Sequence, residues 1–262
     1  MVVFGVRNSI PPLVRAARKH GIMTHRKFSP IAPPQARDLG YSLRRHFVDD
    51  FHIRHVAGIP QGSLVLDLGG NRVGKRGIFD IDRYNIHVIY ANLSVAKLPN
   101  IQADAAALPF REGLFDAVIC SELLEHVPDP VDVVTEIHRV TKRKGMVLIC
   151  VPFLNRIHGD PEDYGRYTDR YWRRVLERAG FTEISIEKQG FFWSVLVDMI
   201  RDVTYSRTQQ GVLRRQWGRN LIGAVLSAAK SRALQWDSSV DEADGSILHC
   251  FTTGFGIEAI KS

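Results

Sequence analysis

The sequence is poor in cysteine and contains no long apolar run. Its three cysteines, Cys120, Cys150 and Cys250, lie far apart, so their spacing indicates neither a disulfide framework nor a metal site. We expect buried thiols in a reducing compartment. No apolar stretch reaches the roughly 18 residues that span a bilayer, and the N-terminus lacks the apolar core of a secretory signal. We therefore expect a cytoplasmic protein that binds no metal.

Internal repeats and low-complexity tracts are also missing. The 262 residues are 45% hydrophobic and 24% charged, which excludes a disordered chain and a collagen-like repeat and allows a sizeable core. A single α/β domain of this length is common.

Positive charge is concentrated toward the two ends of the chain. Residues 1–60 hold ten Lys/Arg against three Asp/Glu, residues 201–235 hold seven against one, and residues 61–200 are slightly acidic. Basic ends suit anionic partners, and peripheral membrane contact through 1–60 and 201–235 is one interpretation. A solvated surface is the alternative.

The sequence predicts a basic arm followed by one domain with an insertion. Residues 1–38 are predicted to form a basic arm in which the proline-rich segment 30–37 is an extended linker. One domain follows over 39–262. A late strand at 251–260 leaves residues 191–248 as a helical insertion before it. This insertion includes a basic amphipathic helix that would pack on the domain, on a second subunit of a homodimer, or on a membrane surface.

Short apolar runs alternate with helical patterns in the middle of the chain. We predict buried parallel strands at 63–69, 87–91, 115–120 and 146–151. We predict helices at 40–57, from Asp129 to Gly145, and from Thr168 to Gly180. Strands that alternate with helices indicate a doubly wound α/β sheet, which binds ligands beyond the carboxyl ends of its strands.

The glycines after the first strand allow two nucleotide-binding alternatives that fit poorly. Gly69-x4-Gly74-Lys75 resembles a phosphate-binding loop, but Arg76 stands where a Mg²⁺-ligating hydroxyl is needed. The G-x-G-x-x-G pattern of dinucleotide sites is absent. Neither ATP nor NAD is therefore favoured.

Several motifs in order carry a family resemblance. They are VLDLGG at 65–70, IYANLS at 89–94, QADAAALPF at 102–110 and FDAVICSELLEHVP at 115–128. Together they strongly resemble class I S-adenosylmethionine (SAM)-dependent methyltransferases of the small-molecule type 11 group. The resemblance covers roughly residues 40–190 and the last strand. It implies a Rossmann-like, doubly wound sheet of seven strands with the last strand antiparallel.

The resemblance also implies SAM as cofactor and a set of binding residues at strand ends. These residues are Asp67, Gly69, Gly70, Asn92, Asp104, Ala105, Ser121 and Glu122. The first three would face the methionine end, Asn92 the ribose, Asp104 and Ala105 the adenine, and the last two the methyl-transfer site. The chain departs from the pattern at Asn92, where the family usually has an acid, and over 71–85, where the first helix has little periodicity.

The polar loop 151–168 follows the fifth predicted strand and resembles a loop of a methyltransferase subgroup associated with glycan or polysaccharide biosynthesis. Its alternative role is a hydrogen-bonded structural loop before the Thr168 helix. The candidate catalytic residues in and near it are His158, His126, Asp163 and Tyr164. We favour His158 as the base because histidine titrates in the right range. We expect His126 to orient the helix after the fourth strand.

We therefore predict a methyltransferase whose acceptor is a hydroxyl of a small molecule, a sugar or a lipid-linked glycan. Nucleic acid is not an expected partner, because the fourth strand ends in Ser-Glu-Leu-Leu and not in the Asn/Asp-Pro-Pro-Tyr/Phe type motif of base-amine methylation. The alternative is a non-catalytic SAM-binding or scaffold module with a degenerate fold.

Overall fold

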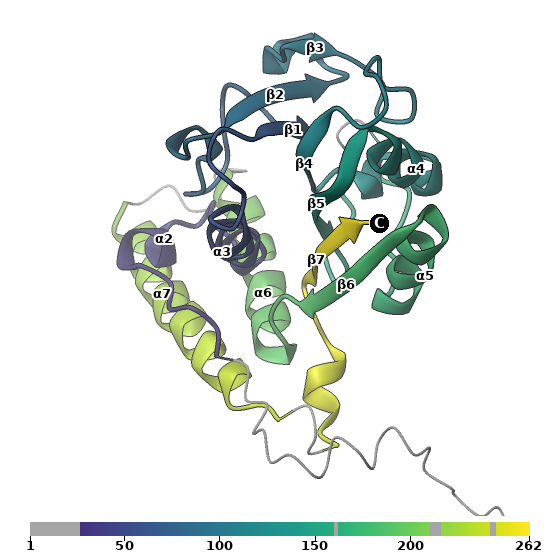
Figure 1. The fold of residues 1–262 in the computed structure, drawn as a ribbon. Helices are drawn as coiled ribbons and strands as arrows, with labels where there is room; N and C mark the ends of the chain where they lie inside the picture. The colour runs from purple at the N-terminus through teal and green to yellow at the C-terminus, as the bar shows by residue number, and fades with distance from the viewer. Residues whose placement is uncertain (1–26, 160–161, 210–215, 242–244) are drawn as a thin grey trace, which may run out of the picture.

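The computed structural model describes residues 27–159, 162–209, 216–241 and 245–262, and its centre is one seven-stranded sheet (Figure 1). The strand order is β3-β2-β1-β4-β5-β7-β6. The strands are β1 (Leu64–Leu68), β2 (His87–Asn92), β3 (Ile101–Gln102), β4 (Phe115–Ser121), β5 (Thr141–Pro152), β6 (Phe181–Lys188) and β7 (Gly254–Lys261). β7 is antiparallel to β5 and β6, and β1 to β5 are parallel. The predicted fold class is confirmed.

Helices cover both faces of this sheet. α4 (Pro130–Val140) and α5 (Asp169–Ala179) lie on one face, and α3 (Leu43–Val56) lies on the other. Successive strand residues point to opposite faces, so Leu66 and Leu68 of β1 pack under α4 and α5, whereas Val65 packs under α3. Both faces are therefore apolar, as the continuous apolar runs predict.

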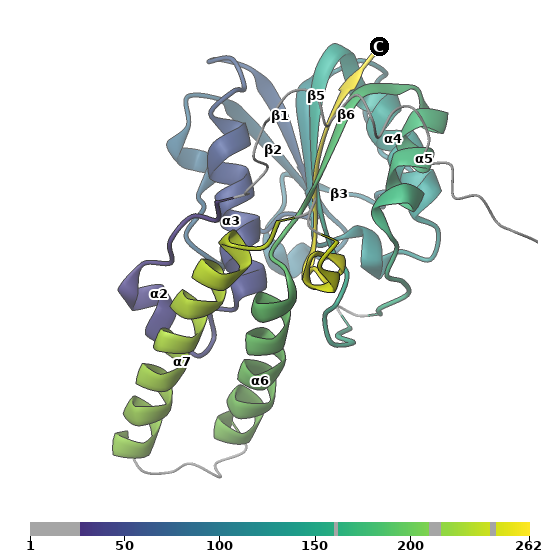
Figure 2. The ribbon, with the colours of Figure 1, turned by 90° about the horizontal axis from the view of Figure 1, so that it is seen from below.

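The remaining helices form a hairpin between β6 and β7. α6 (Phe192–Gln209) and α7 (Gln216–Ser238) lie side by side and extend away from the sheet (Figure 2), and the 3-10 helix η4 (Ile247–Cys250) leads into β7. None of the described helices has the length and apolar character needed to cross a membrane. The predicted basic helix begins within residues 210–215, which lie outside the described residues, as does most of the basic arm 1–38.

Two local predictions were wrong. The predicted linker contains a short helix, α2 (Pro33–Arg37), whose Ala36 is buried in a cluster with α3 and α7. Proline is tolerated in a first helical turn, and here apolar burial decides the conformation. The helix predicted to reach Gly145 ends at Val140, because residues from Thr141 onward pair with β4. Lys142 pairs with Asp116 of β4 and does not cap a helix.

The weak helix prediction after β1 agrees with the structure. Between β1 and β2 there is no α-helix, and a single turn, η1 (Ile81–Arg83), interrupts an irregular loop. Two more turns follow later strands, η2 (Val95–Lys97) after β2 and η3 (Leu124–His126) after β4. These turns and loops stand at the carboxyl edge of the sheet, where a doubly wound fold places its ligand.

Candidate functional site

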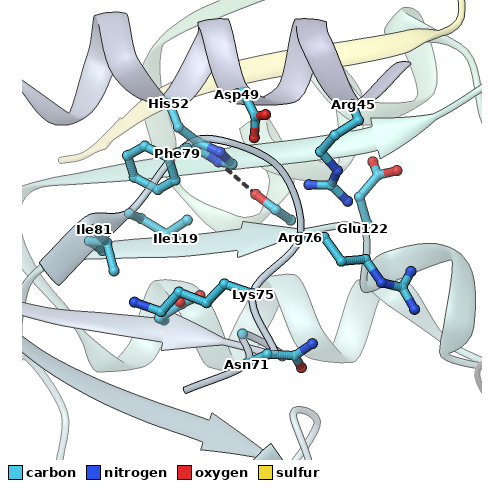
Figure 3. Close-up of a pocket in the computed structure, with 14 residues that line it drawn as sticks. Arg45, Asp49, His52, Asn71, Lys75, Arg76, Phe79, Ile81, Ile119 and Glu122 are labelled. Atoms are coloured by element: carbon cyan, nitrogen blue, oxygen red, sulfur yellow. Dashed lines mark hydrogen bonds between the residues drawn. The ribbon is translucent and has the colours of Figure 1, made fainter. Parts of the chain in front are cut away.

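A pocket of about 170 Å³ lies at the carboxyl ends of β1 and β4, under α3 (Figure 3). The predicted residues Asp67, Gly69, Gly70, Ser121 and Glu122 all line it. The other lining residues come from α3 and from the loop after β1; they are Arg45, Asp49, His52, Asn71, Lys75, Arg76, Phe79, Ile81 and Ile119. We call this space the first pocket.

Asp67 is a carboxylate without a partner in the first pocket. Burial raises its pKa to about 7, although the nearby Lys75 ammonium opposes this shift. Within the described part of the chain, no group donates a hydrogen bond to it, because Lys75 donates to Asp80 and Asp82 instead. A cationic amine placed here would restore the ionised form.

The glycine turn beside Asp67 leaves room for nothing larger than glycine. Gly69 has φ +79°, in the left-handed region that favours glycine. A Cβ atom on Gly70 would lie 2.2 Å from the Asp67 carboxyl group. The turn therefore brings bare backbone to the pocket wall.

Asn92 supports this turn from outside the first pocket. Its Nδ2 donates to the carbonyl oxygens of Gly69 and Gly70 at 2.9 and 3.2 Å, and its Oδ1 accepts from Ser94 N at 2.9 Å. Asp104 and Ala105 also lie outside the pocket lining. Asp104 is exposed after β3, and its Oδ1 accepts from Ala106 N at 2.9 Å. The predicted ribose and adenine roles of these residues stay predictions.

A buried histidine of α3 holds the hydroxyl at the end of β4. His52 Nε2 lies 2.7 Å from Ser121 Oγ. Burial lowers the pKa of His52 to about 3, and Arg45 adds to the shift, so the ring is neutral at pH 7. This contact orients the Ser121 side chain within the first pocket.

Glu122 sits in a strained backbone position directly after β4. Its φ is +53°, in the left-handed region that non-glycine residues rarely adopt. Its carboxylate forms an ion pair with Arg44 of α3, which is 3% exposed. Burial opposes ionisation of Glu122, but Arg44 outweighs burial and lowers its pKa.

A second pocket of about 400 Å³ adjoins the first, because Arg45, Arg76 and Glu122 line both. His158, from the loop after β5, lines the second pocket. Asp163 fixes this loop, since it accepts from His158 N at 2.8 Å and pairs with Arg166. Its hydrogen bond from Arg166 lowers the pKa of Asp163 to about 2.

These contacts give the four predicted catalytic residues different places relative to the two pockets. His158 faces a pocket, whereas Asp163 stays ionised and positions the loop. Tyr164 is 52% exposed and lines neither pocket, although its backbone N donates to Glu125 O at 2.7 Å. His126 Nδ1 lies 2.6 Å from the Glu162 carbonyl oxygen, so it ties η3 to the same loop.

Sequence reasoning missed the polar side of α3. Arg44, Asp49 and His52 are buried in this helix, whereas the sequence predicts a helix at 40–57 without a site residue. Buried polar groups need partners. The recurrence of such residues at one-turn and two-turn spacing was the available signal that this helix covers a site and not only a core.

The fold and the glycine-walled pocket define a Rossmann-like methyltransferase fold of class I. Comparison with known proteins agrees: residues 57–149 match the family model described as "Methyltransferase domain". Residues 57–149 are therefore similar to a methyltransferase domain.

One similar curated protein is the ubiquinone biosynthesis O-methyltransferase of Pseudomonas aeruginosa (strain UCBPP-PA14), which is 36% identical over 139 residues, 47% of this chain and 53% of the relative. Another, from Mycolicibacterium smegmatis, is described as a probable S-adenosylmethionine-dependent methyltransferase and is 30% identical over 168 residues, 60% of this chain and 62% of the relative. The chain thus spans about half the length of the first of these relatives.

Solved structures share the fold at low identity. Phosphoethanolamine N-methyltransferase 2 of Haemonchus contortus, in complex with S-adenosyl-L-methionine, aligns with TM-score 0.51 and 16% identity over 82% of this chain and 52% of that one. The [4+2]-cyclase SpnF aligns with TM-score 0.52 and 19% identity over 83% and 80%. Because a cyclase shares it, the fold by itself does not fix the reaction.

Proposed function

We propose that this chain transfers a methyl group from SAM to a hydroxyl oxygen of an acceptor that occupies the second pocket. The observation that carries the proposal is the unpartnered Asp67 carboxylate beside the Gly69–Gly70 turn, in a pocket that opens to His158 through shared walls. This arrangement offers a site for a cationic amine, bare backbone for close approach, and a basic group on the far side.

The first pocket suits the methionine end of the cofactor. Its ammonium group would pair with Asp67. Its carboxylate would meet the guanidinium of Arg45, which lines the same pocket (Figure 3). Ser121, held by His52, would face the same end, and Asn92 and Asp104 would lie toward the nucleoside.

Methyl transfer is an in-line displacement that needs an aligned acceptor and removal of its proton. His158 Nδ1 lies 3.1 Å from the Arg156 carbonyl oxygen and 3.4 Å from Arg166 Nη2, and the nearer carbonyl oxygen favours the tautomer with the ring proton on Nδ1. The Nε2 lone pair is then left as the proton acceptor. Asp163 keeps the loop in place and is not the base, because its pKa is about 2.

The pockets support an acceptor with a polar head and an apolar part. A third pocket of about 610 Å³ shares Asn155, Arg156 and Arg201 with the second, and Leu154, Met199 and Val203 add apolar wall. A lipid-linked sugar fits this profile. So does a prenylated phenol, and the similarity to a ubiquinone biosynthesis O-methyltransferase favours O-methylation in quinone biosynthesis. A screen that includes both acceptors decides between them.

Contact with a membrane surface is the proposed route for such an acceptor. Met199, Ile200 and Val203 are each at least half exposed on α6, next to the third pocket. The predicted basic segments 1–60 and 201–235 would add attraction to anionic lipid. Binding to anionic vesicles that disappears at high salt is the expected result.

The second candidate is a SAM-binding module without methyltransferase activity. Two features favour it: both polar atoms of the Asn92 side chain are already engaged, and the loop after β1 contains no α-helix. A scaffold would retain its function when His158 is replaced, whereas an enzyme would not.

Calorimetric titration with SAM and with its demethylated product tests the cofactor part of the proposal. We expect micromolar binding of both, no binding of ATP–Mg²⁺ or NAD, and much weaker binding of both adenosyl ligands in Asp67→Asn. Asp163→Asn is the matched control that should bind normally, because Asp163 lies outside the first pocket. Absence of adenosyl binding in the unmodified chain would overturn the proposal.

A further inference from the structure

We propose that Glu125, His126 and His158 bind a divalent transition-metal ion beside the second pocket. One ligand atom from each side chain lies within 4.8 Å of the other two. Glu125 and His126 belong to η3, and His158 comes from the loop after β5. The spacing in the sequence did not indicate this set, because two separate loops supply it.

The Glu125 carboxylate is buried and lacks a partner. Glu125 is 2% exposed, and neither of its oxygens has a hydrogen-bond partner among the described residues. Its Oε1 lies 3.6 Å from His126 Nε2, which is too far for a hydrogen bond. A buried carboxylate is costly unless a cation or a donor compensates it. An ion between these side chains would supply that compensation.

Both imidazole rings are oriented for coordination. His126 Nδ1 lies 2.6 Å from the Glu162 carbonyl oxygen, and His158 Nδ1 lies 3.1 Å from the Arg156 carbonyl oxygen and 3.4 Å from Arg166 Nη2. In each ring the carbonyl oxygen is the nearest partner of Nδ1, which favours a proton on Nδ1 and a free lone pair on Nε2. Metal-bound histidines are held in this way by a hydrogen bond from the second ring nitrogen.

The separations suit a tetrahedral ion after a small movement. Zinc bonds of about 2.0–2.1 Å place the ligand atoms of a tetrahedral site about 3.4 Å apart. The 3.6 Å contact between Glu125 and His126 is already close to this value. His158 has the most freedom to close in, since its side chain is 25% exposed and that of His126 is 9% exposed.

Glu122 is not a member of the set, because its carboxylate is already paired with Arg44. Two imidazoles and one carboxylate favour Zn²⁺, Co²⁺ or Fe²⁺ over Mg²⁺ or Ca²⁺. Three protein ligands leave a fourth position open, and His158 lines the second pocket. The open position therefore lies toward the space proposed for the acceptor.

The consequence for the reaction rests on the proposed function, whereas metal binding does not. An ion in this position would bind the acceptor oxygen and lower the pKa of its hydroxyl group. The ion and a proton would compete for the same Nε2 lone pair of His158. His158 would then act as the base only in the metal-free protein.

Titration of the full, chelator-stripped chain with Co²⁺ tests the site without any acceptor. We expect one equivalent to bind with the visible absorption of tetrahedral Co²⁺ and to be displaced by Zn²⁺. Glu125→Gln keeps the shape of the side chain, and we expect it to weaken binding by on the order of 100-fold, as His126→Asn and His158→Asn would.

Two control variants should bind Co²⁺ normally. His87→Asn removes an exposed histidine at the start of β2. Cys250→Ser removes an exposed thiol whose Sγ lies 3.7 Å from His249 Nε2, the rival site in the described residues. Thiolate-to-cobalt charge-transfer absorption would indicate that Co²⁺ binds at Cys250 instead.

Three outcomes would overturn the proposal: no Co²⁺ or Zn²⁺ binding, binding that survives all three substitutions, or binding lost in Cys250→Ser. Titration of the same preparation with SAM separates this result from the proposed function. Either ligand can bind when the other does not.

Discussion

Arg44 of α3 and Glu122, the residue after β4, form a buried ion pair with 2.5 Å between Nη2 and Oε1. The pair holds the strained Glu122 backbone where the first and second pockets meet. Arg44 also donates to Gln189, so one guanidinium links α3, the residue after β4 and the segment before α6.

Breaking this ion pair from one side should destabilise the fold. Arg44→Met leaves the Glu122 carboxylate buried and uncompensated, and we expect a loss of about 3–5 kcal/mol in the free energy of unfolding. The double variant Arg44→Met/Glu122→Gln removes both charges and should lose less than Arg44→Met alone. Denaturant unfolding of the unmodified protein, Arg44→Met, Glu122→Gln and the double variant measures this coupling, and strictly additive losses would contradict it.

Gly70→Ala should abolish cofactor binding. The new Cβ would lie 2.2 Å from the Asp67 carboxyl group, so the turn or Asp67 must move. Gly113→Ala is the control, because Gly113 has φ +60° but open space around it, and it should lose about 1 kcal/mol of stability with unchanged SAM affinity. Calorimetry compares the two variants, and equal SAM affinities would disprove the assigned role of the turn.

Cofactor affinity should depend on pH through Asp67. Below its pKa of about 7 the carboxyl group is protonated, and it must lose that proton to pair with the cofactor ammonium. Affinity should therefore fall as the pH drops from about 7 toward 5 and level off above 7. Asp67→Asn should bind weakly with little dependence over this range. A pH profile unchanged by that substitution would assign the titration to another group.

Two substitutions in the loop after β5 should have different effects on turnover. We expect His158→Ala to lower turnover by ~10²-fold or more with unchanged SAM affinity. Tyr164→Phe should change turnover less than about twofold, because its exposed ring lines neither pocket. Rate measurements with saturating cofactor test both, and a large effect of Tyr164→Phe would return the tyrosine to the site.

Hydrophobic periodicity and the motifs at strand ends predicted most of the helices and strands of the fold. The runs at 63–69 and 115–120 predicted β1 and β4, and Thr168 and Gly180 do cap α5. The short helix α2 and the early end of α4 were missed, because burial against α7 and pairing with β4 decide them, and neither contact is local in sequence.

The candidate site was predicted only in part, because the sequence indicates its strand-end residues but not those that a helix brings to it. Residues at strand ends share one edge of the sheet, so Asp67, Ser121 and Glu122 could be placed together from sequence. The contributions of Arg45 and His52 depend on how α3 docks. That docking follows from long-range contacts, which a local pattern does not contain.

The docking of α3 has a consequence for how this chain could be shortened or recombined. Asp198 of α6 accepts hydrogen bonds at 2.7 Å from the backbone N–H groups of Leu43 and Arg44, which begin α3. Lys230 of α7 donates to the carbonyl oxygens of Asp38 and Tyr41, just before them. The hairpin is thus a clamp on the helix that carries Arg44, Arg45 and His52. Replacing this hairpin by another would therefore also change the position of α3 at the first pocket. A change in the hairpin surface and a change in the pocket are thus coupled in this fold.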